Sequence, residues 1–268
     1  MKLNIVPART GLTWVKLGIR TFFKQPLALS GLFFMFMAVL SVASLLPFVG
    51  SALALALLPA ATLGLMAATL ESTRGKFPMP SILISAFRAQ QRKRAMLVLG
   101  LLYALGFLGM MGLTALIDGG QFARLYLLGG KITEEMVLQG DFQMAMWAAM
   151  LLYLPLSLLF WHAPALVHWH GMSPAKSLFF SFMACYKNFG ALAVFGLVWV
   201  GLLIGMALVV TLIAALLDNP GLAGIAMFPA AMLMVSMFFS SLYFTFRDSF
   251  VDEQDDPQTP PHTVDINA

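Results

Sequence analysis

The residues best suited to chemistry are three histidines in the stretch Trp-His-Ala-Pro-Ala-Leu-Val-His-Trp-His, which runs from residue 161 to residue 170. Imidazole side chains bind metal ions and haem. His162 and His168 are six residues apart and His168 and His170 are two apart, whereas two ligands on one helix face need a spacing of four. We therefore interpret the stretch as an aromatic and histidine belt at a membrane interface. We predict no catalytic residue, no metal site and no cofactor.

Methionine and hydroxyl side chains offer two further chemistries. The chain has 19 methionines, but Met110 and Met111 are adjacent rather than four apart, which favours packing over a copper path. Serine and threonine hydroxyls within the apolar segments could line a route for a lipid or an uncharged solute. Proton or sodium coupling is disfavoured because these segments hold no charged side chain.

The elements that carry these residues are long apolar segments. The sequence is 60% hydrophobic and only 10% charged, with a mean hydropathy of +0.87, so a water-soluble fold could not bury its apolar surface. A bilayer core about 30 Å thick needs about 20 helical residues. Six segments of that length contain no Asp, Glu, Lys or Arg: 27–46, 50–70, 95–117, 142–166, 189–217 and 221–246. We predict an all-α polytopic membrane helical bundle, with six transmembrane helices in one domain over residues 27–246.

The basic residues predict the orientation of the chain. Of the 16 Lys and Arg residues, only Arg124 and Lys131 lie in the loop 118–141, and the other fourteen fall on the opposite face. The positive-inside rule makes that face cytoplasmic, so both termini are expected in the cytoplasm. We expect seven of these side chains to face lipid headgroups rather than nucleic acid. They are Lys16, Arg20, Lys24, Arg88, Arg92, Lys93 and Arg94.

Three cytoplasmic stretches resemble one another, because each precedes a pair of spans. Residues 1–26 predict an interfacial amphipathic helix with Trp14 at headgroup depth. Its apolar face contacts either lipid or the protein's own bundle. Pro80-Ser81 and Ser173-Pro174 begin similar stretches, the latter running to Asn188. We predict three helix-plus-hairpin repeats.

Prolines and glycines within the spans predict local geometry. Pro59, Pro155 and Pro229 occupy the second span of each repeat, where they would kink the helix or act as hinges. The alternative is coincidence, because proline is common in membrane helices. Spaced glycines predict close helix packing, either within the chain or in a homodimer. They are Gly106, Gly109 and Gly112 in the third span and Gly201 and Gly205 in the fifth.

The connecting and terminal segments complete the plan. The loop 118–141 is expected to hold a short helix from Thr133. Residues 247–268 are acidic and contain prolines, which predicts a disordered cytoplasmic tail. The single cysteine, Cys185, is expected to be a buried or cytoplasm-facing thiol.

The Gln25-Pro26-Leu27 start of the first span and the Ser173-Pro174-Ala175 to Asn188 approach to the fifth carry a family resemblance. They resemble uncharacterised bacterial multi-pass inner-membrane proteins of the YciC-like six-helix type, and the membrane region of some glycerophosphodiester phosphodiesterases. The chain has no phosphodiesterase domain, so the resemblance implies a bacterial inner membrane and no catalytic residue.

The sequence thus favours a non-enzymatic envelope protein that partners a larger complex. The alternative is a carrier for a lipid or an uncharged small solute. Expected partners are the lipid bilayer and either another membrane protein or a second copy of the chain.

Overall fold

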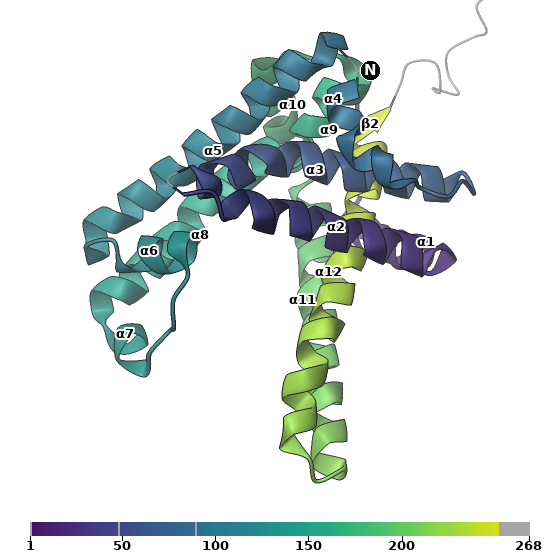
Figure 1. The fold of residues 1–268 in the computed structure, drawn as a ribbon. Coiled ribbons are helices and arrows are strands. Elements are labelled where there is room, and N and C mark those ends of the chain that lie inside the picture. The colour runs from purple at the N-terminus through teal and green to yellow at the C-terminus, as the bar shows by residue number, and fades with distance from the viewer. Residues whose placement is uncertain (1, 48, 89, 252–268) are drawn as a thin grey trace, which may run out of the picture.

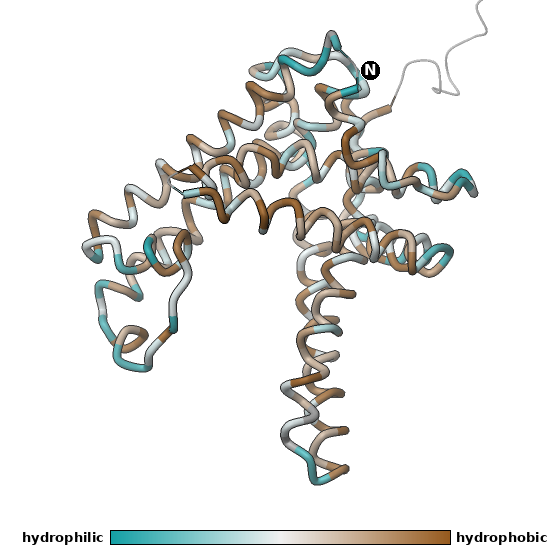
Figure 2. The backbone as a smooth tube through the Cα atoms, viewed as in Figure 1, coloured by the Kyte–Doolittle hydropathy of each residue, from teal (hydrophilic) through white to brown (hydrophobic). Residues whose placement is uncertain are grey.

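The computed structural model describes residues 2–47, 49–88 and 90–251. Six of its helices are long and apolar enough to cross a membrane, which confirms the predicted all-α membrane bundle. Figure 2 shows hydrophobic residues along these helices and hydrophilic residues mainly at their connections. The six are α2 (Pro26–Ser44), α3 (Gly50–Thr73), α5 (Gln90–Asp118), α8 (Gly140–Phe160), α11 (Phe189–Leu216) and α12 (Pro220–Ser249).

Shorter elements connect and flank the long helices. α7 begins after Thr133, whose hydroxyl accepts a hydrogen bond from the Met136 amide, so the short helix predicted there is confirmed. The short helices are α1 (Thr10–Lys24), the 3-10 helix η1 (Pro80–Ile84), α4 (Ser85–Arg88), α6 (Gln121–Leu128), α7 (Glu134–Leu138), α9 (Ala163–His170) and α10 (Pro174–Lys187). Two strands, β1 (Lys2–Leu3) and β2 (Phe250–Val251), pair antiparallel.

The short helices that precede the hairpins share one packing pattern. Each lies against the second long helix of the preceding hairpin: η1 and α4 on α3, and α10 on α8. α1, which precedes the first hairpin, packs on α12, the second helix of the last hairpin. The first and last parts of the chain are thereby joined in the same way as neighbouring hairpins. The β1–β2 pair reinforces this connection and brings the two ends of the described chain together.

The third hairpin differs from the other two in its surroundings. α3 packs on α5, and the Ser51 hydroxyl donates to the Leu127 carbonyl of α6, so the first two hairpins stay in contact. The α11–α12 hairpin projects away from them (Figure 1). Between Val200 and Val235 only Ala214 is buried among the described side chains. The outer half of this hairpin therefore has almost no neighbour among the described residues.

The fourth candidate span, Gly140–His170, covers the predicted window but contains a break. The window 142–166 is not one helix, because α8 ends at Phe160 and α9 begins at Ala163. Pro164, at the start of α9, cannot continue a helix from α8 because its ring would collide with the Phe160 carbonyl. The Ser181 hydroxyl of α10 fills the break: it accepts from the His162 amide at 2.9 Å and donates to the Leu158 carbonyl at 2.8 Å. These two backbone groups would bond directly in a continuous helix, so Ser181 is inserted into the hydrogen-bond ladder.

Replacing Ser181 with alanine is expected to lower the free energy of unfolding by about 1–2 kcal/mol. Two buried backbone groups lose their partner, and they recover part of the loss only if the helix straightens. Denaturation of purified protein with SDS in mixed micelles measures the effect. Ser157→Ala is the matched control, because the Ser157 hydroxyl donates to its own helix at Leu154. Equal losses in the two variants would contradict the bridging role of Ser181.

Two predictions at the chain ends need correction. The Trp14 side chain does not face lipid: it is 0% exposed, and α1 packs on α11 and α12. The apolar face of α1 therefore contacts the protein's own bundle, which is one of the two predicted alternatives. The acidic tail cannot begin at residue 247, because α12 continues to Ser249 and β2 to Val251. Residues 252–268 lie outside the described residues.

Candidate functional site at the helix-end junction

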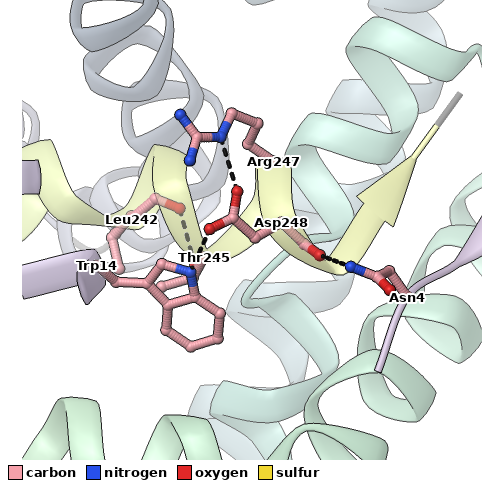
Figure 3. A network of polar contacts seen from close by, with 6 residues as sticks. All are labelled: Asn4, Trp14, Leu242, Thr245, Arg247 and Asp248. Carbon is pink, nitrogen blue, oxygen red and sulfur yellow. Dashed lines mark hydrogen bonds and ion pairs between the residues drawn. The ribbon is translucent and has the colours of Figure 1, made fainter. Parts of the chain in front are cut away.

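A polar network joins the N-terminal segment to the end of α12 (Figure 3). Asp248 Oδ2 accepts a hydrogen bond from Trp14 Nε1 at 2.9 Å, and Oδ1 accepts one from Arg247 Nε at 2.7 Å. Asn4 Nδ2 donates to the Asp248 carbonyl at 2.9 Å. A carboxylate with both oxygens bonded can stay charged in a partly buried place. Asp248 thus attaches α1 and the N-terminal segment to α12.

Asn188, at the start of α11, makes the second set of connections. Its buried side chain accepts from the Val6 amide at 2.9 Å and donates to the Asn4 carbonyl at 2.9 Å and to Ser249 Oγ at 3.3 Å. One amide thus joins three segments of the chain: the N-terminal segment, the start of α11 and the end of α12. We call the set Asn4, Trp14, Asn188, Arg247, Asp248 and Ser249 the helix-end junction.

An open cavity of about 420 Å³ lies beside the junction. Its walls combine aromatic and basic side chains, and we call it the basic-aromatic cavity. The Trp169 ring lies 5.1 Å from the Phe246 ring and 6.0 Å from the Tyr243 ring, centroid to centroid. The lining residues are Leu70, Arg74, Trp169, His170, Tyr243, Phe246, Arg247, Phe250 and Val251.

The three histidines of the predicted belt have different environments. His162 is buried, with its ring 5.9 Å from Phe246 and 5.6 Å from Phe250, and its Nδ1 has no hydrogen-bond partner among the described residues. His168 is half-buried, and His170 lines the basic-aromatic cavity. Within the described ranges no three His, Cys, Asp or Glu side chains are grouped as a metal site. The belt itself stays a prediction.

The seven basic residues predicted to face headgroups divide into two groups. Six are exposed: Lys16, Arg20 and Lys24 on α1, Arg88 on α4, and Lys93 and Arg94 at the start of α5. Arg92 differs because it is half-buried and donates to the His168 carbonyl. That carbonyl belongs to the last turns of α9, where a cation is favoured by the helix dipole. Arg92 therefore connects α5 to α9, and headgroup contact by the other six stays a prediction.

The predicted packing glycines are only partly near another helix. A Cβ built on Gly106 would lie 2.9 Å from Leu156 Cδ1 of α8. Positions 109, 112, 201 and 205 have no described atom within 4 Å of such a Cβ. Instead, Gly11 lies against the Ala191 carbonyl, Gly18 against Ser241, Gly64 against Leu83 and Gly100 against the Ala56 carbonyl.

The predicted hinge prolines lie within continuous helices. Pro59 is buried in α3, whereas Pro155 in α8 and Pro229 in α12 are exposed. The structure does not bring the three together. Their role as kinks or hinges stays a prediction.

The hydroxyls of the spans mostly bond to their own helices. Thr69, Thr114 and Ser240 each donate to a carbonyl three or four residues earlier. A separate cavity of about 170 Å³ lies between α5, α6 and α8, and its lining is aromatic and methionine-rich. The lining residues are Phe107, Met110, Met111, Phe122, Tyr126, Met146, Ala149, Met150 and Tyr153.

Cys185 is buried on α10, and burial raises the pKa of its thiol to about 12. At pH 8 about one such thiol in ten thousand is ionised, against about a quarter at an ordinary pKa of about 8.5. We expect N-ethylmaleimide to leave the native protein unmodified and to react after denaturation in SDS, as measured by mass. Tyr186→Cys in a Cys185→Ser background is the control, because Tyr186 is 64% exposed and should react at once. Fast labelling of native Cys185 would refute the buried placement.

Sequence reasoning missed Asp248, Asn4 and Arg74. Asp248 was assigned to the acidic tail, although it follows the last span directly, where a charge is close to the bundle. Arg74 was counted only toward orientation. Their positions near the ends of spans were the available signal, but the partners lie 234 residues away for Asp248, so the sequence alone could not pair them.

Comparison with known proteins gives one relevant match. The chain is 36% identical to a protein of Burkholderia thailandensis described as a probable inner membrane protein. The match extends over 265 residues, which are 97% of this chain and 98% of the relative. The chain matches no protein-family profile and no solved structure.

Proposed function

This chain belongs to the family of the Burkholderia inner membrane protein, and we propose that it acts without catalysis, as a partner of another membrane protein in the envelope. Its relative and its six apolar helices make it an integral inner-membrane protein. The non-catalytic part of the proposal is supported by the sequence, because the six apolar windows hold no Asp, Glu, Lys or Arg, the charged side chains on which chemistry at membrane depth usually depends.

The projecting α11–α12 hairpin carries the proposal. Its outer half exposes apolar side chains on every side, including Leu203, Leu208 and Leu212. Gly201 and Gly205 are one turn apart, with open space where a side chain would be. Small residues at this spacing let a second helix approach closely in a bilayer. We infer that a helix of another protein packs along this notch.

Photo-crosslinking in living cells tests this inference. A benzoyl-phenylalanine at Leu208 should give a crosslinked protein adduct, whereas one at Val39, exposed on α2, should give lipid adducts only. Gly205→Leu should abolish the adduct, and Gly31→Leu, also a glycine with open space around it, should not. An adduct of twice the chain mass would identify the partner as a second copy. Lipid adducts alone at both positions would refute the proposal.

The second candidate is a carrier for a lipid or an uncharged solute. It is favoured by the apolar cavity of about 170 Å³ between α5, α6 and α8, which suits an acyl chain or a small apolar molecule. Ala149→Phe would fill this cavity. Loss of a transported or co-purified apolar molecule in that variant, with normal abundance of the protein, would favour the carrier over the partner.

We also propose that both termini are cytoplasmic. The β1–β2 pair places the two described ends at one end of the molecule, and fourteen of the 16 basic residues fall on the same predicted face. Reporter fusions after residue 130 should be active outside the cytoplasm, and fusions after residues 85 and 255 inside it. The reverse pattern would overturn the orientation.

We also propose that the chain is related to the YciC-type six-helix proteins. The six-helix plan with short helices before each hairpin supports it. An experimental structure of a YciC-type protein with a different helix order would contradict it.

A further inference from the structure

Two guanidinium groups from distant parts of the sequence line the basic-aromatic cavity. Arg74 follows the last turn of α3, and Arg247 lies in the last turn of α12. The packing of α12 on α3 brings them to one place. Tyr243 lines the same cavity as the two arginines. Two cations and a phenolic donor therefore surround one open space.

Both arginines keep donors for a ligand. Arg247 uses Nε for Asp248, lies 5.0 Å above the Phe244 ring and has a side chain 45% exposed. Its terminal nitrogens, and the guanidinium of Arg74, have no hydrogen-bond partner among the described residues. The nearby carboxylate, Asp248, is shared with Trp14, so positive charge remains. The planar fork of a guanidinium matches the oxygens of a phosphate.

The walls of the cavity add an amphipathic environment. Trp169, Tyr243 and Phe246 present aromatic faces, and Leu70 extends the apolar wall along α3. The cavity lies at the ends of two spans, which is the depth of lipid headgroups, and tryptophan and tyrosine are favoured there. A ligand with a phosphate and an apolar body would match both parts.

We propose that the basic-aromatic cavity binds a phosphate ester, the group that an anionic phospholipid presents at its headgroup. Arg74 and Arg247 bond the phosphate oxygens, and the Tyr243 hydroxyl donates to one of them. The glycerol and the first part of the acyl chains lie along Leu70 and Phe246. This inference does not depend on the partner proposed for the α11–α12 hairpin.

Native mass spectrometry of the purified full-length protein, titrated with phosphatidylglycerol in micelles, tests the site. We expect Arg74→Gln and Arg247→Lys each to weaken phosphatidylglycerol binding about tenfold. Arg74→Gln removes a positive charge, and Arg247→Lys removes the bidentate fork of the guanidinium. The matched control is Lys176→Gln, an exposed cation of α10 outside the cavity, which should leave binding unchanged. The neutral lipid phosphatidylcholine should bind about tenfold more weakly than phosphatidylglycerol to the unmodified protein.

A second titration distinguishes the two sources of the phosphate. Glycerol 3-phosphate is added to protein in nanodiscs of phosphatidylcholine. Weak binding of this soluble ester, together with the Arg74 dependence above, assigns the site to a lipid. If glycerol 3-phosphate binds tightly and Arg74→Gln abolishes this binding, the cavity is a phosphate site whose ligand is a soluble ester. Equal effects of Arg74→Gln and Lys176→Gln on phosphatidylglycerol, or no effect of either, would overturn the proposal, because binding would then not involve this cavity.

Discussion

Replacing Trp14 with alanine is expected to lower the free energy of unfolding by about 3–5 kcal/mol. The side chain is 0% exposed, it meets Phe195 edge-on with ring centroids 6.2 Å apart, and its Nε1 donates to Asp248. Truncation leaves a cavity where α1 packs on α11 and α12, and it leaves a carboxylate oxygen without its donor. Denaturation with SDS in mixed micelles, followed by circular dichroism, measures the loss.

Two companion variants separate the ring from its hydrogen bond. Trp14→Phe keeps most of the packing and removes the donor, so we expect a loss of about 1–3 kcal/mol. In an Asp248→Ala background the same change should cost much less, because the partner is already gone. Leu12→Ala, at an exposed position of the same helix, should change stability by no more than about 0.5 kcal/mol. If Trp14→Ala were as mild as Leu12→Ala, α1 would rest on lipid rather than on the bundle.

The long helices could be predicted because one local property determines them. A span must be apolar and free of charge over about 20 residues, and each predicted window overlaps a candidate span of the structure, the fourth with a break after Phe160. The short helix after Thr133 was predictable for a similar reason, because the capping hydroxyl and the acidic first turn are adjacent in the sequence. Neither prediction requires knowledge of a distant contact.

The predictions that were wrong or missing all concern contacts between residues far apart in the sequence. An amphipathic helix shows the same residue pattern whether its apolar face meets lipid or protein, so the sequence could not decide the surroundings of Trp14. The break after Phe160 depends on Ser181 of another helix. The position of Asp248 is typical of an acidic tail, and its bond to Trp14 joins residues 234 apart in the sequence. The basic-aromatic cavity, which is lined by both Arg74 and Arg247, could not be predicted for the same reason.

Glycines show this limit most clearly. The spacing of three or four along one helix selected Gly106, Gly109 and Gly112, but spacing says nothing about which face a neighbour occupies. On the same helix, Gly100 lies where a Cβ would overlap the Ala56 carbonyl of α3. Gly109 faces open space. Close approach of α3 and α5 therefore depends on a single glycine that no regular spacing marks.

Gly100→Ala and Gly109→Ala should accordingly change stability in opposite directions. At position 100 the new methyl group meets backbone that cannot rotate away, so α3 and α5 must separate, and we expect a loss of about 2–3 kcal/mol. At position 109 nothing obstructs the methyl group, and alanine is the better helix former by about 0.5–1 kcal/mol, so the variant should be as stable as the unmodified protein or more so. SDS denaturation of the two proteins measures both changes. A neutral Gly100→Ala would mean that the α3–α5 approach is not what holds the first two hairpins together. The Ser51–Leu127 contact at their outer ends would then have to account for their association.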